Sequence, residues 1–340
     1  MIRSWQALSA LWITSVTIII GLAILGTSLG STYIPLGEVI HSLQTALGLD
    51  GGTGVSGAID RIIVDIRLPR VLLAVCVGAG LATVGTLLQT TTRNDLADPF
   101  LFGLSSGAAA GAVAVISFVG DRLGVWTLPI ATFVGAMLSA ASVLSLVMTR
   151  EEQGPERLII AGLAVSFLFG ALTSFLVFAG DQRAAYSVLF WSVGGLGLAS
   201  WGNIFIAALG AVLAIGAGLF LHWRLDALLA GEETAYSLGV DVTQLRRNVF
   251  ILAALATASF VALSGVIGFV GLMVPHLSRA LVGVNHRPLV VTGALLGAIM
   301  LLAGDLLART LLAPQELPVG IVTAAAGGAF IIALVLRRSP

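Results

Sequence analysis

The sequence predicts an all-α polytopic integral membrane protein with about ten transmembrane helices in a single domain, residues 1–340. Of its 340 residues, 58% are hydrophobic and only 10% are charged, whereas an ordinary soluble domain carries about 25% charged residues. So few charges cannot cover a water-facing surface, which excludes soluble, disordered and collagen-like proteins. The net charge of zero gives no long-range attraction to nucleic acid.

Charge-free runs locate the spans, because a helix needs about 20 residues to cross the hydrocarbon core. The first run is interpreted as a span near 8–29, since it is longer than the apolar core of a signal peptide. The run 184–223 is broken by glycines and predicts a short interfacial helix followed by one span. The run 248–278, with a break at Ser264-Gly265, predicts two spans, near 247–263 and 266–284, which brings the total to ten. The nine runs are 4–37, 71–92, 99–120, 123–149, 158–180, 184–223, 248–278, 288–304 and 317–336.

Arginine placement supports a topology with both termini in the cytosol. Ten spans put the two ends on one side, and the positive-inside rule asks that side to carry more arginine. Eleven arginines then lie inside: Arg3, Arg93, Arg150, Arg157, Arg224, Arg246, Arg247, Arg279, Arg287, Arg337 and Arg338. Six lie outside: Arg61, Arg67, Arg70, Arg122, Arg183 and Arg309.

The composition also excludes several kinds of functional site. All 17 basic residues are arginine, and a phosphate-binding loop of the Walker type needs a lysine. The chain therefore does not hydrolyse ATP by such a site. Cys76 is the only cysteine, so no internal disulfide and no cysteine cluster is expected. No cofactor, no metal site and no catalytic residue is predicted.

The longest segment expected in the cytosol, residues 222–248, is interpreted as one or two short helices with acidic and apolar sides. It is longer than a connection between spans needs. A solvated loop is the plain interpretation, but its length and amphipathicity favour a docking surface for a cytosolic partner.

A few ionisable residues lie within or beside the spans. Asp305 and Arg309 are four residues apart, a spacing that allows an ion pair on one helix. Arg67 and Arg70 flank a proline at the predicted outer start of the second span. They either anchor the helix end or offer guanidinium groups to carboxylates of a partner. His276 is expected to hydrogen-bond to a neighbouring helix.

Five motifs occur in one order from about residue 60 to the C-terminus. They are Arg67-Leu-Pro-Arg70, Arg93-Asn-Asp-Leu-Ala-Asp-Pro99, Gly268-Phe-Val-Gly-Leu-Met-Val-Pro-His276-Leu-Ser-Arg279, Asp305-Leu-Leu-Ala-Arg309 and Glu316-Leu-Pro-Val-Gly320. Together they resemble the FecCD-type permease subunits of ABC importers for iron–siderophores, haem or vitamin B12.

The resemblance implies a permease of the bacterial cytoplasmic (inner) membrane that moves a metal chelate inward by alternating access. A ferric siderophore is the favoured cargo, with haem and cobalamin as alternatives. Expected partners are two cytosolic ATP-binding subunits, an extracytoplasmic substrate-binding protein, membrane lipid and a second permease subunit, a homodimer being favoured. The fifth and tenth spans, near 158–180 and 319–336, would line the path.

Functional positions carry over from the family in three sets. The docking set, which would meet the binding protein, is Arg67, Arg70 and Arg309. The coupling set, which would meet the ATPase, is Glu232, Glu233, Ala235 and Gly239. The cytosolic gate is Asn94 and Leu96. The sequence departs from the family at Asp95, where proline is common, and the second part of the gate, near 155–156, is not assigned.

Two other functions are open to a membrane protein of this composition. A proton-driven secondary transporter would want carboxylates near the membrane midplane, and the charge-free runs contain none. An intramembrane enzyme would have to use His276 and Asp305, and no nucleophile–base pair accompanies them. The permease interpretation is therefore preferred.

Overall fold

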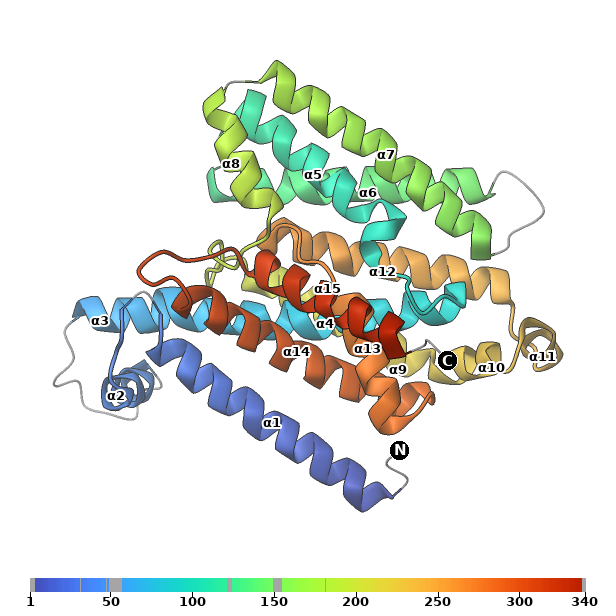
Figure 1. The fold of residues 1–340 in the computed structure, drawn as a ribbon, viewed down its shortest axis with the longest axis horizontal. Helices are drawn as coiled ribbons and strands as arrows, with labels where there is room; N and C mark the ends of the chain where they lie inside the picture. Colours follow the sequence, from blue (N-terminus) through green and yellow to red (C-terminus); the bar gives the residue numbers. More distant parts are fainter. Residues whose placement is uncertain are drawn as a thin grey trace.

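The computed structural model describes residues 4–30, 32–46, 48, 57–120, 124–148, 155–180 and 182–337. Within these ranges every regular element is a helix, as the composition predicts (Figure 1). The elements are α1 (Trp5–Ser28), α2 (Leu36–Ala46), α3 (Gly57–Arg61), η1 (Ile62–Arg67), α4 (Leu68–Thr92), η2 (Pro99–Phe102), α5 (Leu104–Ala114), η3 (Val115–Val119), η4 (Gly124–Trp126), α6 (Thr127–Met148), α7 (Pro155–Ala179), α8 (Gln182–Ser192), α9 (Ile204–Phe220), α10 (His222–Leu229), α11 (Glu232–Ser237), α12 (Val242–Ser264), α13 (Val270–Val282), α14 (His286–Thr310) and α15 (Val319–Arg337).

Ten of these helical stretches match the predicted spans. In the described part of the chain, seven helices are long and apolar enough to cross a membrane: α1, the helix from Gly57 to the end of α4, α6, α7, α12, α14 and α15. The other three are shorter: α9, α13, and α5 continued by η3. The predicted interfacial helix is α8, and the predicted break between two spans lies at Gly265, between α12 and α13.

The second span starts earlier than predicted. The charge-free run begins at residue 71, yet the helix is continuous from Gly57 to Thr92. The predicted start was wrong because it assumed that a charge ends a span. Here Arg67 and Arg70 have partners inside the bundle, so the helix continues through them. Helix α14 runs to Thr310 and carries both Asp305 and Arg309, as their spacing predicts.

The helix α4 lies at the centre of the bundle and contacts α9, α12, α13 and α14. Helices α5, α6 and α7 form a group on one side of it, and α1 lies along α14 on the other side (Figure 1). Helix α1 begins and α15 ends at the end of the bundle where α10 and α11 lie (Figure 1). This placement is what an even number of crossings requires.

Small residues let the central helices touch backbone to backbone. A Cβ atom on Gly78 of α4 would lie 2.3 Å from the Gly297 carbonyl oxygen on α14, and one on Gly297 would lie 2.2 Å from the Gly78 oxygen. Neither position has room for even a methyl group. Stripes of small residues thus bring helices together as expected in lipid.

Candidate functional site

The three predicted docking arginines lie together in one cluster, which we call the arginine cluster and which comprises Arg67, Arg70, Asp305, Arg309 and Glu316. Its centre is the Asp305 carboxylate, which is 1% exposed. Arg70 Nη2 lies 2.9 Å from one oxygen of Asp305, and Arg309 Nε lies 2.9 Å from the other. Arg70 Nη1 also lies 2.7 Å from Glu316 Oε2. The ion pair that the Asp305–Arg309 spacing allows is therefore present.

Two of these arginines also hold the end of α1. Arg67 Nη1 donates to the carbonyl oxygens of Thr27 and Ser28, at 2.8 and 2.7 Å. Arg309 Nη1 donates to those of Gly26 and Leu29, at 2.9 and 3.2 Å. The last carbonyls of a helix have no partner in their own helix, and a cation there also suits the helix dipole. The cluster therefore joins α1, α4 and α14.

Burial bears directly on the predicted docking role. Arg67 and Arg309 are 5% and 2% exposed, and the Arg70 side chain is 13% exposed. Each guanidinium already has acceptors within this chain. The role of Arg67, Arg70 and Arg309 in docking stays a prediction. The sequence suggested the ion pair of Arg309 with Asp305 and helix anchoring by Arg67 and Arg70, but not the contacts of Arg67 and Arg309 with the end of α1.

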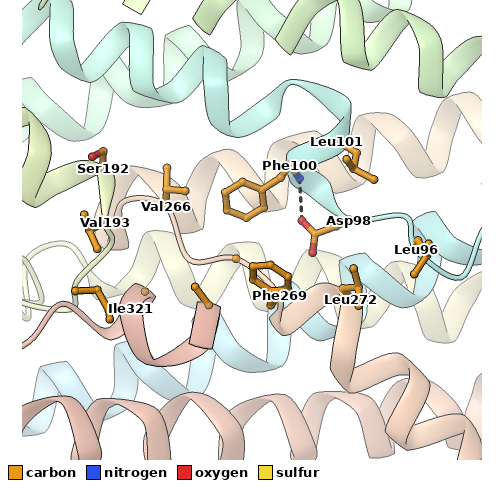
Figure 2. Close-up of a pocket in the computed structure, with 13 residues that line it drawn as sticks. Leu96, Asp98, Phe100, Leu101, Ser192, Val193, Val266, Phe269, Leu272 and Ile321 are labelled. Carbon is orange, nitrogen blue, oxygen red and sulfur yellow. Dashed lines mark hydrogen bonds between the residues drawn. The ribbon is translucent and has the colours of Figure 1, made fainter. Parts of the chain in front are cut away.

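A cavity of about 600 Å³ lies between the turn after α4, the end of α8 and the starts of α13 and α15. Figure 2 shows its lining, which comes from the turn after α4, from η2, from the end of α8 and from the starts of α13 and α15. The lining is apolar apart from a few groups, and it includes the predicted gate residue Leu96 together with Phe100, Phe269 and Ile321.

The predicted gate residues form one tight turn at the edge of this cavity. Helix α4 ends at Thr92 and is followed by Arg93, which adopts a left-handed conformation (φ 49°). Asn94 Oδ1 then accepts a hydrogen bond from the Leu96 N–H group at 2.9 Å, a local turn that asparagine favours. Leu96 is 50% exposed and borders the cavity. The structure thus brings Asn94 and Leu96 together, whereas most of the turn near 155–156 (residues 149–154) lies outside the described residues.

Asp98 places a carboxyl group in the cavity lining. One oxygen accepts the Phe100 N–H group at 3.0 Å and so caps η2 (Figure 2). The residue is 6% exposed. Burial disfavours the charged form and raises the pKa of Asp98 to about 6, although the Phe100 hydrogen bond opposes the shift. The sequence pointed to the polar turn 92–98 but not to a buried acid in it.

Phe269 is a second cavity residue that sequence reasoning missed. It precedes α13 with φ 69°, a conformation that non-glycine residues rarely adopt. Its ring occupies the space left open by Gly327 of α15, where a Cβ atom would lie 2.2 Å from Phe269 Cγ. The pairing of a large residue with a glycine 58 positions further on leaves no local signal in the sequence.

The four predicted coupling residues lie on or next to α11, in the segment 222–248. This segment forms two short helices, α10 and α11, before α12 begins, as predicted. Ala235 is fully buried and packs in a cluster with Leu225, Leu228 and Val242. Glu233 is exposed, as are Tyr236 and Leu238, which are 54% and 62% exposed.

Gly239 ends α11 in the left-handed conformation that the predicted tight turn needs. Its φ is +78°, which glycine adopts without the cost that a Cβ atom brings. The Gly239 N–H group donates to the Tyr236 oxygen, and the Val240 N–H group donates to the Ala235 oxygen, both at 2.9 Å. The turn therefore satisfies carbonyls that the helix end would otherwise leave free.

A second polar group fixes α10 to the bundle. Asp226 Oδ1 lies 2.7 Å from His286 Nδ1 and accepts the His286 backbone N–H group at 2.9 Å. Burial alone would raise the pKa of Asp226, but the two hydrogen bonds from His286 outweigh burial, so the pKa of Asp226 is lowered. His286 is fully buried at the start of α14.

Comparison with known proteins agrees with this architecture. The hemin transport system permease protein HmuU of Yersinia pestis is 41% identical over 290 residues, 84% of this chain and 86% of the relative. The cobalamin import system permease protein BtuC of Halobacterium salinarum is 41% identical over 287 residues, 84% of this chain and 76% of the relative. A solved structure of a metal-chelate type ABC transporter in an inward-facing conformation matches with a TM-score of 0.82 at 31% identity, covering 97% of this chain and 99% of that one.

The match is to a whole permease rather than to one motif. Residues 16–337 match the model of the FecCD transport family, which spans every site described above. The relatives named here are permease proteins of a hemin transport system and of a cobalamin import system. This chain belongs to the FecCD transport family.

Proposed function

We propose that this chain is the transmembrane permease subunit of an ATP-driven importer that moves a metal chelate inward by alternating access. The observation that supports this most directly is the apolar cavity of about 600 Å³ whose lining includes Leu96 of the predicted gate turn. A turn that borders a cavity can open or close it when the turn moves. The family membership supplies the reason to read the cavity as a path.

Two cytosolic ATP-binding subunits would meet the chain at α11. Its exposed surface carries Glu233, Tyr236 and Leu238, and a short helix that protrudes with apolar and acidic groups suits a cleft on a partner. The segment 222–248 would be the coupling part of a single domain formed by residues 1–340. ATP hydrolysis would take place in those subunits, because the chain has no lysine for a Walker site.

A second permease copy would complete the path, and a homodimer is the simplest arrangement. The coupling segment and both termini would lie in the cytosol and the arginine cluster at the outer face of the inner membrane. An extracytoplasmic binding protein would dock near that cluster. The Glu316 side chain is 38% exposed, and its carboxylate lies 2.7 Å from Arg70. A carboxylate at the surface therefore reaches this guanidinium, which supports the docking role.

The cargo is proposed as a metal chelate. Two relatives are named for hemin and cobalamin, and a ferric siderophore is the member of this class that we favour. All three are bulky metal complexes, and a cavity of about 600 Å³ is within the size range of small-molecule sites.

The test is to solubilise the chain gently from its native membrane and to identify what co-purifies, with stoichiometry. We expect one ATP-binding subunit per copy of this chain, together with one kind of permease. A chain that emerges alone and reproducibly in mild detergents would overturn the proposal. It would favour a proton-driven transporter, in which Asp98 would be the proton-binding carboxyl group in the cavity.

A further inference from the structure

We propose that Arg246 is the positioning residue that joins the coupling helix α11 to the gate end of α4. This inference rests on the proposed function, because it assigns to one side chain the transmission of motion from the ATPase to the gate. From the sequence alone, Arg246 is expected only as one of the cytosolic arginines.

The contacts of Arg246 span the two elements. It lies on the second turn of α12 and is 7% exposed. Its Nη2 atom lies 2.5 Å from Oε1 of Glu232, the first residue of α11. Its Nε atom donates to the carbonyl oxygen of Thr91 at 2.9 Å. One planar guanidinium therefore holds a side chain of α11 and a backbone atom of α4 at once.

The Thr91 carbonyl is well placed to act on the gate. Helix α4 ends at Thr92, so the carbonyls of its last turn lack N–H partners in their own helix. Thr91 stands three residues before Asn94 and five before Leu96. A displacement of this carbonyl therefore moves the start of the gate turn itself.

The flanks of α11 explain why such a link is needed. Gly231 before the helix has φ +118° and Gly239 after it has φ +78°. A helix of six residues between two glycines can rotate on its connections without moving the rest of the chain. A link through a side chain carries the motion past these flexible points.

Two more polar contacts connect the last turn of α4 to other helices. Thr90 Oγ1 lies 2.8 Å from His286 Nε2, and Asp226 of α10 holds the other ring nitrogen. Gln89 Oε1 accepts from Arg279 of α13, whose Nη2 atom lies 3.3 Å from Asp95 Oδ1 in the gate turn. Helices α10, α11 and α13 thus all reach the last turn of α4, and Arg246 makes the connection to α11.

The matched pair of variants is Arg246→Gln and Arg247→Gln. Arg247 is the next residue on α12 and is exposed, so it controls for the loss of one positive charge at this position of the chain. Each variant is purified as the complex with its ATPase subunits. Hydrogen exchange is followed with and without a non-hydrolysable ATP analogue, at residues 231–239 and at residues 93–98.

In the wild type and in Arg247→Gln we expect the analogue to change exchange in both segments. In Arg246→Gln we expect the change at 231–239 to persist and the change at 93–98 to be lost. A residue that only stabilises the fold would not separate the two segments. Retention of the 93–98 response in Arg246→Gln would overturn the proposal.

A second variant, Arg246→Lys, tests the proposal if the Arg246→Gln chain does not assemble with its ATPase subunits. Arg246→Lys keeps the buried charge, but an ammonium group cannot bridge two acceptors in the fixed fork of a guanidinium. We expect this complex to assemble with a weakened 93–98 response, and a full response would count against the link. No response at 231–239 in the wild type would instead refute the coupling role of α11, and with it the proposed function.

Discussion

The arginine cluster and the coupling end of the bundle both use buried arginines, but they use them on different partners. In the cluster, Arg67 and Arg309 hold the last carbonyls of α1, and Asp305 is shared by Arg70 and Arg309. All of these groups belong to helices of the bundle or their ends. At the coupling end, Arg246 joins spanning helices to a six-residue helix.

The arginine cluster and the coupling end also differ in how deeply their carboxylates are buried. Asp305 is 1% exposed, whereas the Glu232 side chain is 34% exposed. Breaking a buried ion pair leaves a charge without compensation in a medium of low polarity, while a half-exposed partner can be replaced by water. The cluster should therefore matter most for stability, and the coupling end most for activity.

The largest effect is expected at the centre of the cluster. Asp305→Asn leaves two buried guanidinium groups without their shared carboxylate, and we expect it to lower the free energy of unfolding by about 3–5 kcal/mol. The matched change at the coupling end, Glu232→Gln, should cost about 1 kcal/mol or less, because its carboxylate is partly solvated. Unfolding by sodium dodecyl sulfate in mixed micelles measures both. Equal losses of unfolding free energy in the two variants would contradict the proposed difference between the arginine cluster and the coupling end.

The next effect is a gain of stability at the gate side. The pKa of Asp98 is raised from 3.8 to about 6, so the native state binds its proton more tightly than the unfolded chain does. The cost of the buried carboxylate is therefore absent below about pH 4, grows between pH 4 and 6 and is fully present above pH 6. Asp98→Asn should raise the free energy of unfolding at pH 7.5 by up to about 3 kcal/mol.

The control for this change is Ser192→Ala, which alters the same cavity without removing a titratable group. Unfolding free energies are compared from pH 4 to 8. The wild type and Ser192→Ala should lose stability as the pH rises from 4 to 6, and Asp98→Asn should lose less. An unchanged slope in Asp98→Asn would contradict the assignment of this pH dependence to Asp98.

The smallest effect on stability is expected at the turn after α11. Gly239→Ala forces a Cβ atom into the left-handed conformation, at a cost of about 1 kcal/mol, although the space around it is open. Because the turn sets the position of α11, we expect ATP hydrolysis by the purified complex to respond less to transport substrate. Gly216→Ala on α9, which also has open space but no positive φ, should behave as wild type. A normal response in Gly239→Ala would show that this turn does not position α11.

The sequence predicted those features that depend on neighbours along the chain. The apolar runs located the spans, the glycine at 265 located the break between α12 and α13, and the spacing of Asp305 and Arg309 located their ion pair. Each of these rests on helix length or helix periodicity, which a single sequence displays.

The features that the sequence did not predict depend on distant partners. Arg70 is bound by Asp305, 235 residues away, and the Arg309 guanidinium reaches a carbonyl 283 residues away. Without knowledge of these pairs, a charge marks the end of a span, so the early start of the second span at Gly57 was missed. Arg246 was missed for the same reason, since Thr91 lies 155 residues before it.

The backbone contact between Gly78 and Gly297 has a mechanical consequence. It lies in the middle of α4 and α14, and these two helices carry both polar ends of the molecule: Arg70 and Asp305 at one, Thr90 and His286 at the other. Helices in backbone contact resist sliding past one another, so we expect α4 and α14 to tilt as one rigid unit. Since α4 is 25 residues long, about 37 Å at 1.5 Å per residue, a small rotation about this pivot swings the two ends in opposite directions.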